Sequence, residues 1–552
     1  MKFATILPQM TSLKQRVFSA MSLALITGIN PFFRTPPSQA QTLAYCHLSP
    51  QEIARKESLR QGALSGKKED QRAYFKVLTE HAIMLGECRR RTWPQTQAIW
   101  LRLYPCDVQP GAIDRILDNI ANKGYNQVYL EVFYDGQVLL PKANNPTPWP
   151  SVIKTPGYEK VDLLDTAIKK GRQRGFKMYA WFFTMNFGYH YSLREDRQQV
   201  LARNGKGQTT LEAISEASLN EDFADAANQV FVDPYNAQAR QDYLVLVNEV
   251  LKRYPAGMLF DYVRYLRGLG GDSVASNVKH LWIYGDAAQQ ALLQRATNEK
   301  GRYLIGQYLK QGYVTLTDVQ TIAKLYPKEK EPLWQGKIPT PVKPDKDAKA
   351  KADEKDDKKK SPEAKKDPTG KMIPLKDKKD KPEEKKEPLP DPEVLTKELW
   401  LFSVNHARQG IIDFLSVVTQ PAINMGLPVG GVFFPLGNQT VNEGGFDSRL
   451  QPWDKFPASM QFHPMAYGSC GDVSCVLPQI DRVLKMGPQG IEVIPAISGV
   501  WGQKVRTHQS LEEQMMGIQN AFPSLPGVSH FAYAWQEPQD ERQRQICRLQ
   551  PR

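Results

Sequence analysis

The sequence predicts an α/β fold, a (β/α)8 barrel. Eight short segments rich in Val, Ile and aromatic residues alternate with segments of helical periodicity. Strands that alternate with helices build a parallel sheet, and eight repeats can close it into a barrel. The alternative is an open doubly wound sheet, but its GxGxxG phosphate turn is absent after the first strand.

The first half of the predicted barrel has four strands. After the first strand, Ile113, Ile116 and Ile120 recur at the spacing of a helix with one buried face, and Gly124 ends that helix. Two further helices are expected over 162–174 and 237–254, and Asp233 is expected to be the N-cap before the last of them. The four strands are expected at 99–104, 128–133, 177–184 and 258–265.

The second half has four more strands. A helix around 411–419 is expected to end before Pro421, and another is expected over 476–486. Ser510 and Glu513 have the spacing of a capping box for the last barrel helix. The strands are expected at 429–435, 460–467, 491–497 and 528–535.

Segments outside these repeats complete the predicted organisation. Residues 1–40 read as a signal peptide, because Lys14 and Arg16 precede a 13-residue apolar run and Ser38-Gln39-Ala40 resembles a cleavage site. That run is short for a membrane anchor, which needs roughly 20 residues. The remaining segments are expected to be an N-terminal helical segment (41–95), the first half of the barrel with a helical insertion (96–326), a disordered charged spacer (327–392) and the second half of the barrel (393–552).

Charge and cysteine content restrict the possible partners and cofactors of the protein. The net charge of +13 includes +4 from residues 1–40 and +4 from residues 341–390, which leaves +5 for the folded body and argues against a nucleic-acid partner. All six Cys follow the expected cleavage site, so disulfides are expected, and Cys470–Cys475 is the pair with local support. No CxxC or HExxH motif is present, so neither a metal nor a cofactor is expected.

Catalytic side chains of such barrels lie where strands end. Asp261 lies near the end of strand four between aromatic residues, where an acid is costly unless it is used or paired with Arg264 or Arg102. Glu131 alternates with its apolar neighbours in strand two, and Glu537 follows strand eight. We therefore expect the catalytic acids among Asp261, Glu131 and Glu537, whereas Glu492 lies at the opposite end of a strand.

Other polar and aromatic side chains near the strand ends are candidates for binding a sugar. Sugar rings stack on aromatic faces, and their hydroxyl groups bond to polar side chains. Core packing is the alternative for the aromatic and histidine residues. The candidates are Arg102, Asp135, Trp181, Asn186, Tyr262, Arg264, His463, His530 and Trp535.

Several stretches of sequence resemble the bacterial glycosyl-hydrolase-like family-10 barrels. They are WLRLYP, VYLEVFYDG, DLLDTAIKKGRQRGFKMYAWFFTMNFG, VDPYNAQARQDYLVLVNEVLKRYPAGMLFDYVRY and FAYAWQEP. The resemblance implies an exported (β/α)8 barrel associated with glycoside hydrolysis, for some members of cell-wall glycan. It implies that Asp261 is a catalytic or sugar-binding acid. The chain departs from the pattern in three places: Tyr262 follows Asp261 where a second acid is frequent, the end of strand seven has no carboxylate, and the long Lys-rich spacer is outside the pattern.

The expected function is that of an exported, periplasmic or extracellular glycoside hydrolase-like enzyme. It would hydrolyse a polysaccharide through a carboxylate pair, with Asp261 as nucleophile or stabiliser and Glu131 or Glu537 as the acid. Cell-wall glycan is the substrate that the resemblance implies, and no membrane insertion is expected after signal cleavage. The alternatives are a non-catalytic glycan-binding barrel and a structural envelope protein whose spacer holds a partner. The oligomeric state is left open.

Overall fold

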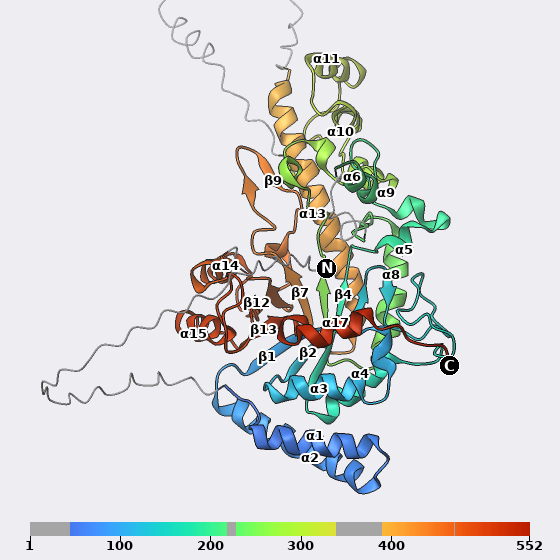
Figure 1. Cartoon of the computed structure of the whole chain (residues 1–552). Coiled ribbons are helices and arrows are strands. Elements are labelled where there is room, and N and C mark those ends of the chain that lie inside the picture. Colours follow the sequence, from blue (N-terminus) through green and yellow to red (C-terminus); the bar gives the residue numbers. More distant parts are fainter. Residues whose placement is uncertain (1–44, 218–227, 338–388, 468–469) are drawn as a thin grey trace, which may run out of the picture. The chain divides into compact units, whose positions relative to one another are not determined.

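The computed structural model describes residues 45–217, 228–337, 389–467 and 470–552, and Figure 1 shows the whole chain. The chain divides into two compact units, one formed by residues up to 290 together with residues from 404 onward, and the other by residues 291–403. The expected signal peptide lies outside the described residues, as do residues 338–388 of the expected spacer.

A parallel sheet forms the centre of the larger unit. The strands are β1 (Thr96–Leu101), β2 (Gln127–Tyr134), β4 (Lys177–Phe183), β5 (Gly257–Asp261), β7 (Val429–Phe433), β10 (Gln461–Pro464), β11 (Glu492–Val493), β12 (Ala496–Ser498) and β13 (Gly527–Phe531). They run in the order β11-β10-β7-β5-β4-β2-β1-β13-β12, and the short β3 (Gln137–Val138) pairs antiparallel with β2.

The sheet closes because β11 and β12 are two parts of one strand. β11 pairs with β10, β12 pairs with β13, and a parallel bridge joins Met465 to Ala496. Pro495, which has no N–H, interrupts the strand between them, but its carbonyl still accepts a hydrogen bond from Ser529 N at 2.9 Å. Eight strand positions therefore surround one core, and the expected (β/α)8 barrel is confirmed.

Aromatic side chains fill the interior of the barrel. Trp100 makes edge contacts with Tyr129 and Trp181, with ring centroids 4.8 and 4.7 Å away, and its Nε1 donates to Ser529 Oγ at 3.1 Å. Gly430 of β7 leaves room for His463, because a Cβ at this glycine would lie 2.7 Å from the imidazole ring. The interior is therefore a packed core and not an open channel.

Helices follow the strands around the barrel (Figure 1). The capping box is confirmed, since Ser510 Oγ accepts from Glu513 N and the Glu513 carboxylate accepts from Ser510 N. The helices are α3 (Ala112–Asn122), α4 (Leu163–Gln173), α5 (Tyr189–Ser192), α6 (Thr210–Ala217), α8 (Ala237–Leu251), α13 (Pro392–Asn424), α14 (Val473–Met486), α15 (Leu511–Ala521), α16 (Tyr533–Gln536) and α17 (Pro538–Ile546). Short loop elements are η1 (Pro105–Val108), η2 (Glu195–Val200), η3 (Gly270–Ser273), η4 (Val278–His280), η5 (Trp453–Lys455) and a small sheet of β6 (Val274–Ala275), β8 (Thr440–Val441) and β9 (Gly445–Asp447).

Several strands end before the expected residue. Strands one, five and six, expected to reach 104, 435 and 467, end at Leu101, Phe433 and Pro464. Strand four ends at Asp261 because Tyr262 has a φ of 52°, which turns the chain out of the sheet. Strand eight ends at Phe531, and Trp535, expected at its end, lies in the short helix α16.

Helix ends also differ from the expectation. The helix expected around 411–419 extends over Pro392–Asn424, and the helix expected over 476–486 begins at Val473. The N-cap of α8 is Asn236, whose side chain accepts from the N–H groups of Gln238 and Ala239, and not Asp233. Instead, Asp233 accepts from Tyr235 N and Ala288 N. Pro421 lies inside α13, which continues to Asn424, because a proline in the last turn removes only one helical hydrogen bond.

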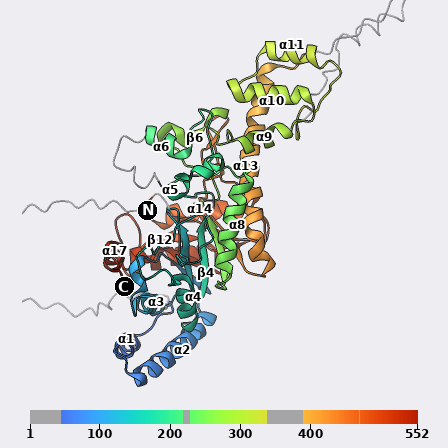
Figure 2. The ribbon, with the colours of Figure 1, turned by 90° about the vertical axis from the view of Figure 1, so that its right-hand side faces the viewer.

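A helical hairpin, α1 (Pro50–Leu64) and α2 (Lys68–Arg91), packs beside α3 and α4 (Figures 1 and 2). Buried Asp118 of α3 anchors it, since this carboxylate accepts from Tyr74 Oη at 2.7 Å and Arg174 Nε at 2.9 Å and lies 3.9 Å from Lys56 Nζ. Burial lowers the pKa of Lys56 to about 8. The hairpin is therefore joined to the barrel through a buried charged cluster.

Three disulfides join the six cysteines. Cys470–Cys475 is the pair predicted from local sequence and is confirmed. The other two are Cys46–Cys88, at the hairpin, and Cys106–Cys547, which joins η1 to the residue after α17. Disulfides of this kind are typical of proteins from oxidising compartments.

The smaller unit contains α10 (Glu299–Gln311), α11 (Leu316–Leu325) and the first turns of α13, and α9 (Asp286–Gln294) crosses its boundary. Residues 327–337, which the sequence analysis assigns to the charged spacer, belong to this unit. Trp334 is buried there, with its ring centroid 5.8 Å from that of Phe402, and Lys337 pairs with Glu331 and Glu398.

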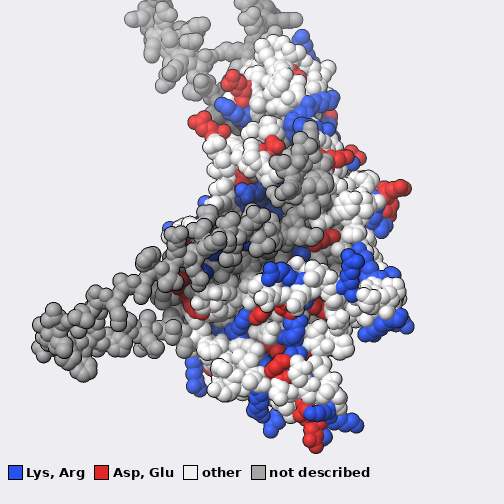
Figure 3. Space-filling view, viewed as in Figure 1, with Lys and Arg blue, Asp and Glu red and all other residues white. Residues whose placement is uncertain are grey.

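The surface carries charges of both signs. Lys and Arg side chains intermix with Asp and Glu on the face shown in Figure 3. In the described part of the chain, every helix is too short or too polar to cross a bilayer.

Candidate active site

Two carboxylates lie on strands that flank β4: Asp261 is the last residue of β5, and Glu131 lies three residues before the end of β2. Glu131 of β2 pairs in register with Trp181 of β4, and Phe183 of β4 pairs with Asp261, the last residue of β5. Since alternate residues of a strand share a face, these four side chains lie on the same face of the sheet, the interior one that Trp181 shares with Trp100. This end of a barrel is where catalytic groups are found.

Arg102, which follows β1, holds Glu131. Its Nε donates to one carboxylate oxygen at 2.5 Å and its Nη2 to the other at 3.0 Å, while Nη1 lies 3.4 Å from Asp135. The guanidinium also lies over the Tyr134 ring, 4.3 Å from its centroid. Glu131 is only 1% exposed. Burial raises the pKa of Glu131, and the charge of Arg102 opposes that rise. Two hydrogen bonds from a guanidinium favour the ionised carboxylate.

Asp261 has a different environment. It is 5% exposed, and its carboxylate accepts from Tyr262 N at 2.6 Å and from Trp181 Nε1 at 3.3 Å. Burial raises the pKa of Asp261 to about 6, while the Tyr262 N–H and the charge of Arg264 lower it, and the charge of Glu131 raises it. The two acids therefore differ: Glu131 has a bidentate cation, and Asp261 is poised to hold a proton near neutral pH.

Aromatic rings and Arg264 continue the site beyond Asp261. Tyr262 is half-buried, and its ring centroid is 4.3 Å from that of Phe183. The Arg264 guanidinium lies 4.4 Å from the Tyr262 centroid. Trp181, Tyr262 and Arg264, all expected to bind sugar, are thus brought together around Asp261.

The two histidines lie on different faces of the sheet. His463 is buried in the barrel interior, where its ring centroid is 5.4 Å from that of Tyr129 and neither ring nitrogen has a hydrogen-bond partner. His530 points outward, and its Nδ1 lies 2.8 Å from Tyr125 Oη with Trp501 beside it. Burial lowers the pKa of both imidazoles to about 3, so both are neutral.

The remaining expected site residues have other partners. Glu537 binds Lys123 Nζ at 2.7 Å, and Trp535 makes an edge contact with His508. Buried Asn186 accepts hydrogen bonds from the N–H groups of Gly188 and Val230, which holds the loop after β4. The structure therefore does not bring Glu537, Trp535 or Asn186 into contact with Asp261.

Tyr467 was missed by the sequence analysis. It follows β10, and its ring centroid lies 5.4 Å from that of Phe531. Burial and then the negative charge of Asp261 raise the pKa of Tyr467. Its position at the end of the expected strand 460–467 is the signal that could have identified it.

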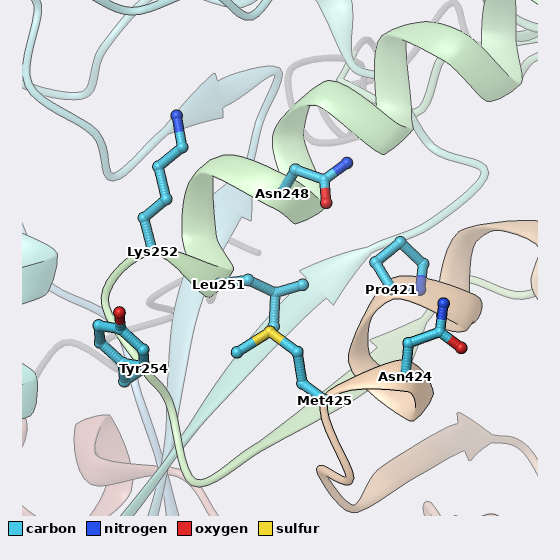
Figure 4. Close-up of a pocket in the computed structure, with 7 residues that line it drawn as sticks. All are labelled: Asn248, Leu251, Lys252, Tyr254, Pro421, Asn424 and Met425. Carbon is cyan, nitrogen blue, oxygen red and sulfur yellow. The ribbon is translucent and has the colours of Figure 1, made fainter.

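Metal binding and pockets are the remaining features of the described residues. No group of three or more His, Cys, Asp or Glu side chains suited to a metal occurs in the described ranges. An open pocket of about 590 Å³ lies where α8 and α13 end, at the amino ends of β5 and β7, away from Asp261 (Figure 4). Its lining residues are Asn248, Leu251, Lys252, Tyr254, Pro421, Asn424 and Met425.

The fold and the site define a (β/α)8 barrel with two buried acids, Glu131 and Asp261, on strands that flank β4. Residues 90–289 match the family model described as glycosyl hydrolase-like 10. The match extends from before β1 to beyond β5, which is the part of the barrel that supplies Arg102, Glu131 and Asp261. The family resemblance predicted from the sequence motifs is therefore confirmed.

The chain is also similar to individual proteins. The glycosyl hydrolase DigH of Escherichia coli K12 is 24% identical over 197 residues, which are 34% of this chain and 42% of DigH, so less than half of that relative is spanned. The PgaB (BpsB) glycoside hydrolase domain of Bordetella bronchiseptica has a TM-score of 0.40 and 13% identity, covering 82% of this chain and 99% of that domain. The cold-adapted β-galactosidase of Rahnella sp. R3 has a TM-score of 0.41 and 12% identity, covering 79% of this chain and 50% of the enzyme.

Proposed function

We propose that this protein is a glycoside hydrolase that cleaves a polysaccharide with Asp261 and Glu131. The observation that carries the proposal is the pair of buried carboxylates on β2 and β5, of which Glu131 accepts from Nε and Nη2 of the Arg102 guanidinium and Asp261 accepts from the uncharged donors Tyr262 N and Trp181 Nε1. Glycoside hydrolysis needs one carboxylic acid to protonate the leaving oxygen and one carboxylate to act as nucleophile or base. The match of residues 90–289 to a glycosyl hydrolase-like family supports the same class of reaction.

The proposed roles reverse those expected from the sequence. Asp261, with a pKa raised to about 6, is the general acid, and Trp181 Nε1 and Tyr262 N orient its oxygens. Glu131 is the ionised partner, because Arg102 binds both of its oxygens and favours the charged form. Glu537 is not proposed as the acid, since its carboxylate binds Lys123.

The proposal extends to the substrate and to the cellular location of the enzyme. We propose an exported enzyme that acts on cell-wall glycan. The signal-like residues 1–40 and the three disulfides support export. The aromatic side chains around Asp261, including Trp181 and Tyr262, support a sugar ligand, because sugar rings stack on aromatic faces.

Site-directed variants test the proposal. Glycan oligomers from chitin and from bacterial cell wall would be incubated with the natural chain, and the products would be identified by mass spectrometry. Asp261→Asn should reduce turnover by roughly 10²–10⁴-fold, the usual contribution of a general acid, and Glu131→Gln should also reduce it strongly. Glu492→Gln is the matched control, since Glu492 is an exposed acid at the amino end of the barrel. Asp261→Asn activity within a few-fold of the natural chain would show that the assignment is wrong.

A non-catalytic glycan-binding barrel is the second candidate. It is favoured by β12 (Ala496–Ser498), because this strand end carries no carboxylate. Calorimetry with the same oligomers distinguishes the two: binding without any product after long incubation supports the binding protein. Product formation that is lost in Asp261→Asn supports the enzyme, and the anomeric form of the first product, read by NMR, then reports retention or inversion.

A further inference from the structure

Arg264 is a buried cation without a carboxylate partner. It is 5% exposed, and its guanidinium lies among three aromatic rings, 4.4 Å from the centroid of Tyr262, 5.6 Å from that of Phe231 and 5.7 Å from that of Phe434. No Asp or Glu of the described residues lies within ion-pair distance of it. A buried charge without such a partner is costly, and cation–π contacts return only part of that cost.

Two other buried arginines, Arg449 and Arg544, have the carboxylate partner that Arg264 lacks among the described residues. Arg449 also lies over the Phe434 ring, at 4.5 Å, but it binds Asp447 through Nε at 2.8 Å and Nη2 at 2.6 Å. Arg544 has the same arrangement with Asp107, at 2.9 and 2.7 Å. In both residues, the Nε–Nη2 edge of the guanidinium holds a carboxylate.

In Arg264 the same edge is free. Nη1 donates to the carbonyl oxygen of Tyr265 at 2.9 Å, which uses the far side of the guanidinium. Nε is buried without any hydrogen-bond partner, and Nη2 has no acceptor in the described part of the chain. The two parallel N–H groups of this edge match the two oxygens of a carboxylate.

The position of Arg264 connects this edge with the proposed catalytic acid. It follows Asp261 by three residues, and a run of contacts links them: Trp181 donates to Asp261, Phe183 lies 5.9 Å from Trp181, and Tyr262 lies between Phe183 and the guanidinium. We propose that the glycan bound at this site carries a carboxylate on one of its sugars, and that the Nε–Nη2 edge of Arg264 binds it. This inference rests on the proposed function and names the chemical class of the substrate.

A carboxylate fits better than a phosphate group. The free edge supplies two N–H groups in one plane, and the neighbouring cation Arg449 is already neutralised by Asp447. A doubly charged phosphate would need more positive charge than this site offers. The carboxylate can belong to a uronic acid or to an acid linked to a sugar through an ether, and the chemistry of recognition is the same.

Binding of a carboxylate would also act on Asp261. The positive charge of Arg264 lowers the pKa of Asp261, whereas burial and the charge of Glu131 raise it. A carboxylate on Arg264 neutralises the cation and so favours the protonated form of Asp261, which is the form that a general acid needs. An acidic substrate would therefore increase the fraction of catalytically competent enzyme.

Calorimetry and turnover with paired substrates test the inference. The full chain would be given hyaluronan oligomers, which carry uronic acids, and cell-wall glycan strands freed of peptide, which carry ether-linked carboxylates. Each would be compared with its own carboxyl-reduced form, in which the carboxylate is an alcohol. We expect at least one carboxylated glycan to bind 10-fold or more tightly than its reduced form, and the arm that shows this difference identifies the source of the carboxylate.

Variants assign the effect to Arg264. Arg264→Gln should remove the preference, so that the carboxylated and the reduced form bind with equal affinity whatever that affinity is, and Arg264→Lys should restore part of the preference as a point charge without the planar fork. Arg449→Gln is the matched control, because this arginine shares Phe434 but already has its carboxylate; it should keep the preference. Equal binding of both forms in both arms by the natural chain overturns the inference even if Arg264→Gln fails to fold.

The outcomes separate the inference from the proposed function. A preference that depends on Arg264, without product formation, supports the carboxylate site and rejects the hydrolase. Hydrolysis that is lost in Asp261→Asn, with no preference for the carboxylated forms, supports the hydrolase and rejects the carboxylate site.

Discussion

The Arg102–Glu131 pair allows one prediction to be worked out from the structure. Arg102→Met keeps an aliphatic chain of similar length but removes all the donors to Glu131, which is 1% exposed and has no other cation within ion-pair distance in the described residues. Breaking a buried ion pair at one partner costs about 3–5 kcal/mol, because the other charge stays buried without compensation. Arg102→Met should therefore be strongly destabilising.

The melting temperature measures this loss. Unfolding entropy is ~2.1 cal/mol/K per residue. The melting temperature of a unit the size of this barrel therefore falls by about 1 °C for each kcal/mol of unfolding free energy that is lost. A decrease of roughly 3–5 °C is expected at pH 8 by differential scanning calorimetry. The loss should be smaller at pH 5, because without Arg102 the pKa of Glu131 rises further and the buried acid then takes up a proton in the folded state. A folded state that binds more protons loses stability as pH rises.

Two further variants complete the test. Glu131→Leu should cost less than Arg102→Met, because Arg102 is 19% exposed on its side chain and still has Asp135 at 3.4 Å. The double variant should recover most of the loss, since replacing a buried pair by apolar groups is often neutral. An Arg102→Met shift below about 1 °C at pH 8, or an equal shift at both pH values, would refute the reasoning.

Two more predictions follow. Burial raises the pKa of Asp261 to about 6, from an ordinary value near 3.9. Because a general acid must be protonated, kcat/KM measured from pH 4 to 9 should fall as pH rises above about 6. A kcat/KM that does not change with pH would contradict the acid role. Removing the Cys106–Cys547 disulfide, whose cysteines are 441 residues apart, should cost more stability than removing Cys470–Cys475, 5 residues apart, because loop-closure entropy grows with length. Melting temperatures of the two double Cys→Ser variants check the order, and equal losses would contradict it.

Much of the fold and part of the site follow from short-range patterns. The strand and helix segments, the Ser510 capping box and the Cys470–Cys475 disulfide were predictable because each depends on residues close in the sequence. Asp261 was also recognisable as a site candidate, since an acid among aromatic residues at a strand end is costly without a use.

The pairing of the charged groups could not be predicted in this way. From the sequence, Asp261 was expected to be paired with Arg264 or Arg102, and only the order β1-β2-β4-β5 decides that the partner of Arg102 is Glu131. It also grouped His463 and His530 as sugar-binding candidates, although one faces the barrel interior and the other faces Tyr125 outside. Which face a strand residue occupies depends on register with its neighbours, and one position of shift reverses it.

The sequence by itself therefore determined the alternation of strands and helices, the family resemblance and the acids at the strand ends, because these are properties of contiguous residues. Tertiary structure alone decided that β11 and β12 close the barrel as one interrupted strand, that Arg102 neutralises Glu131, and that Arg264 keeps a free edge. The physical reason is that hydrogen bonds and ion pairs act over a few ångströms in space, between side chains that lie tens to hundreds of residues apart in the chain.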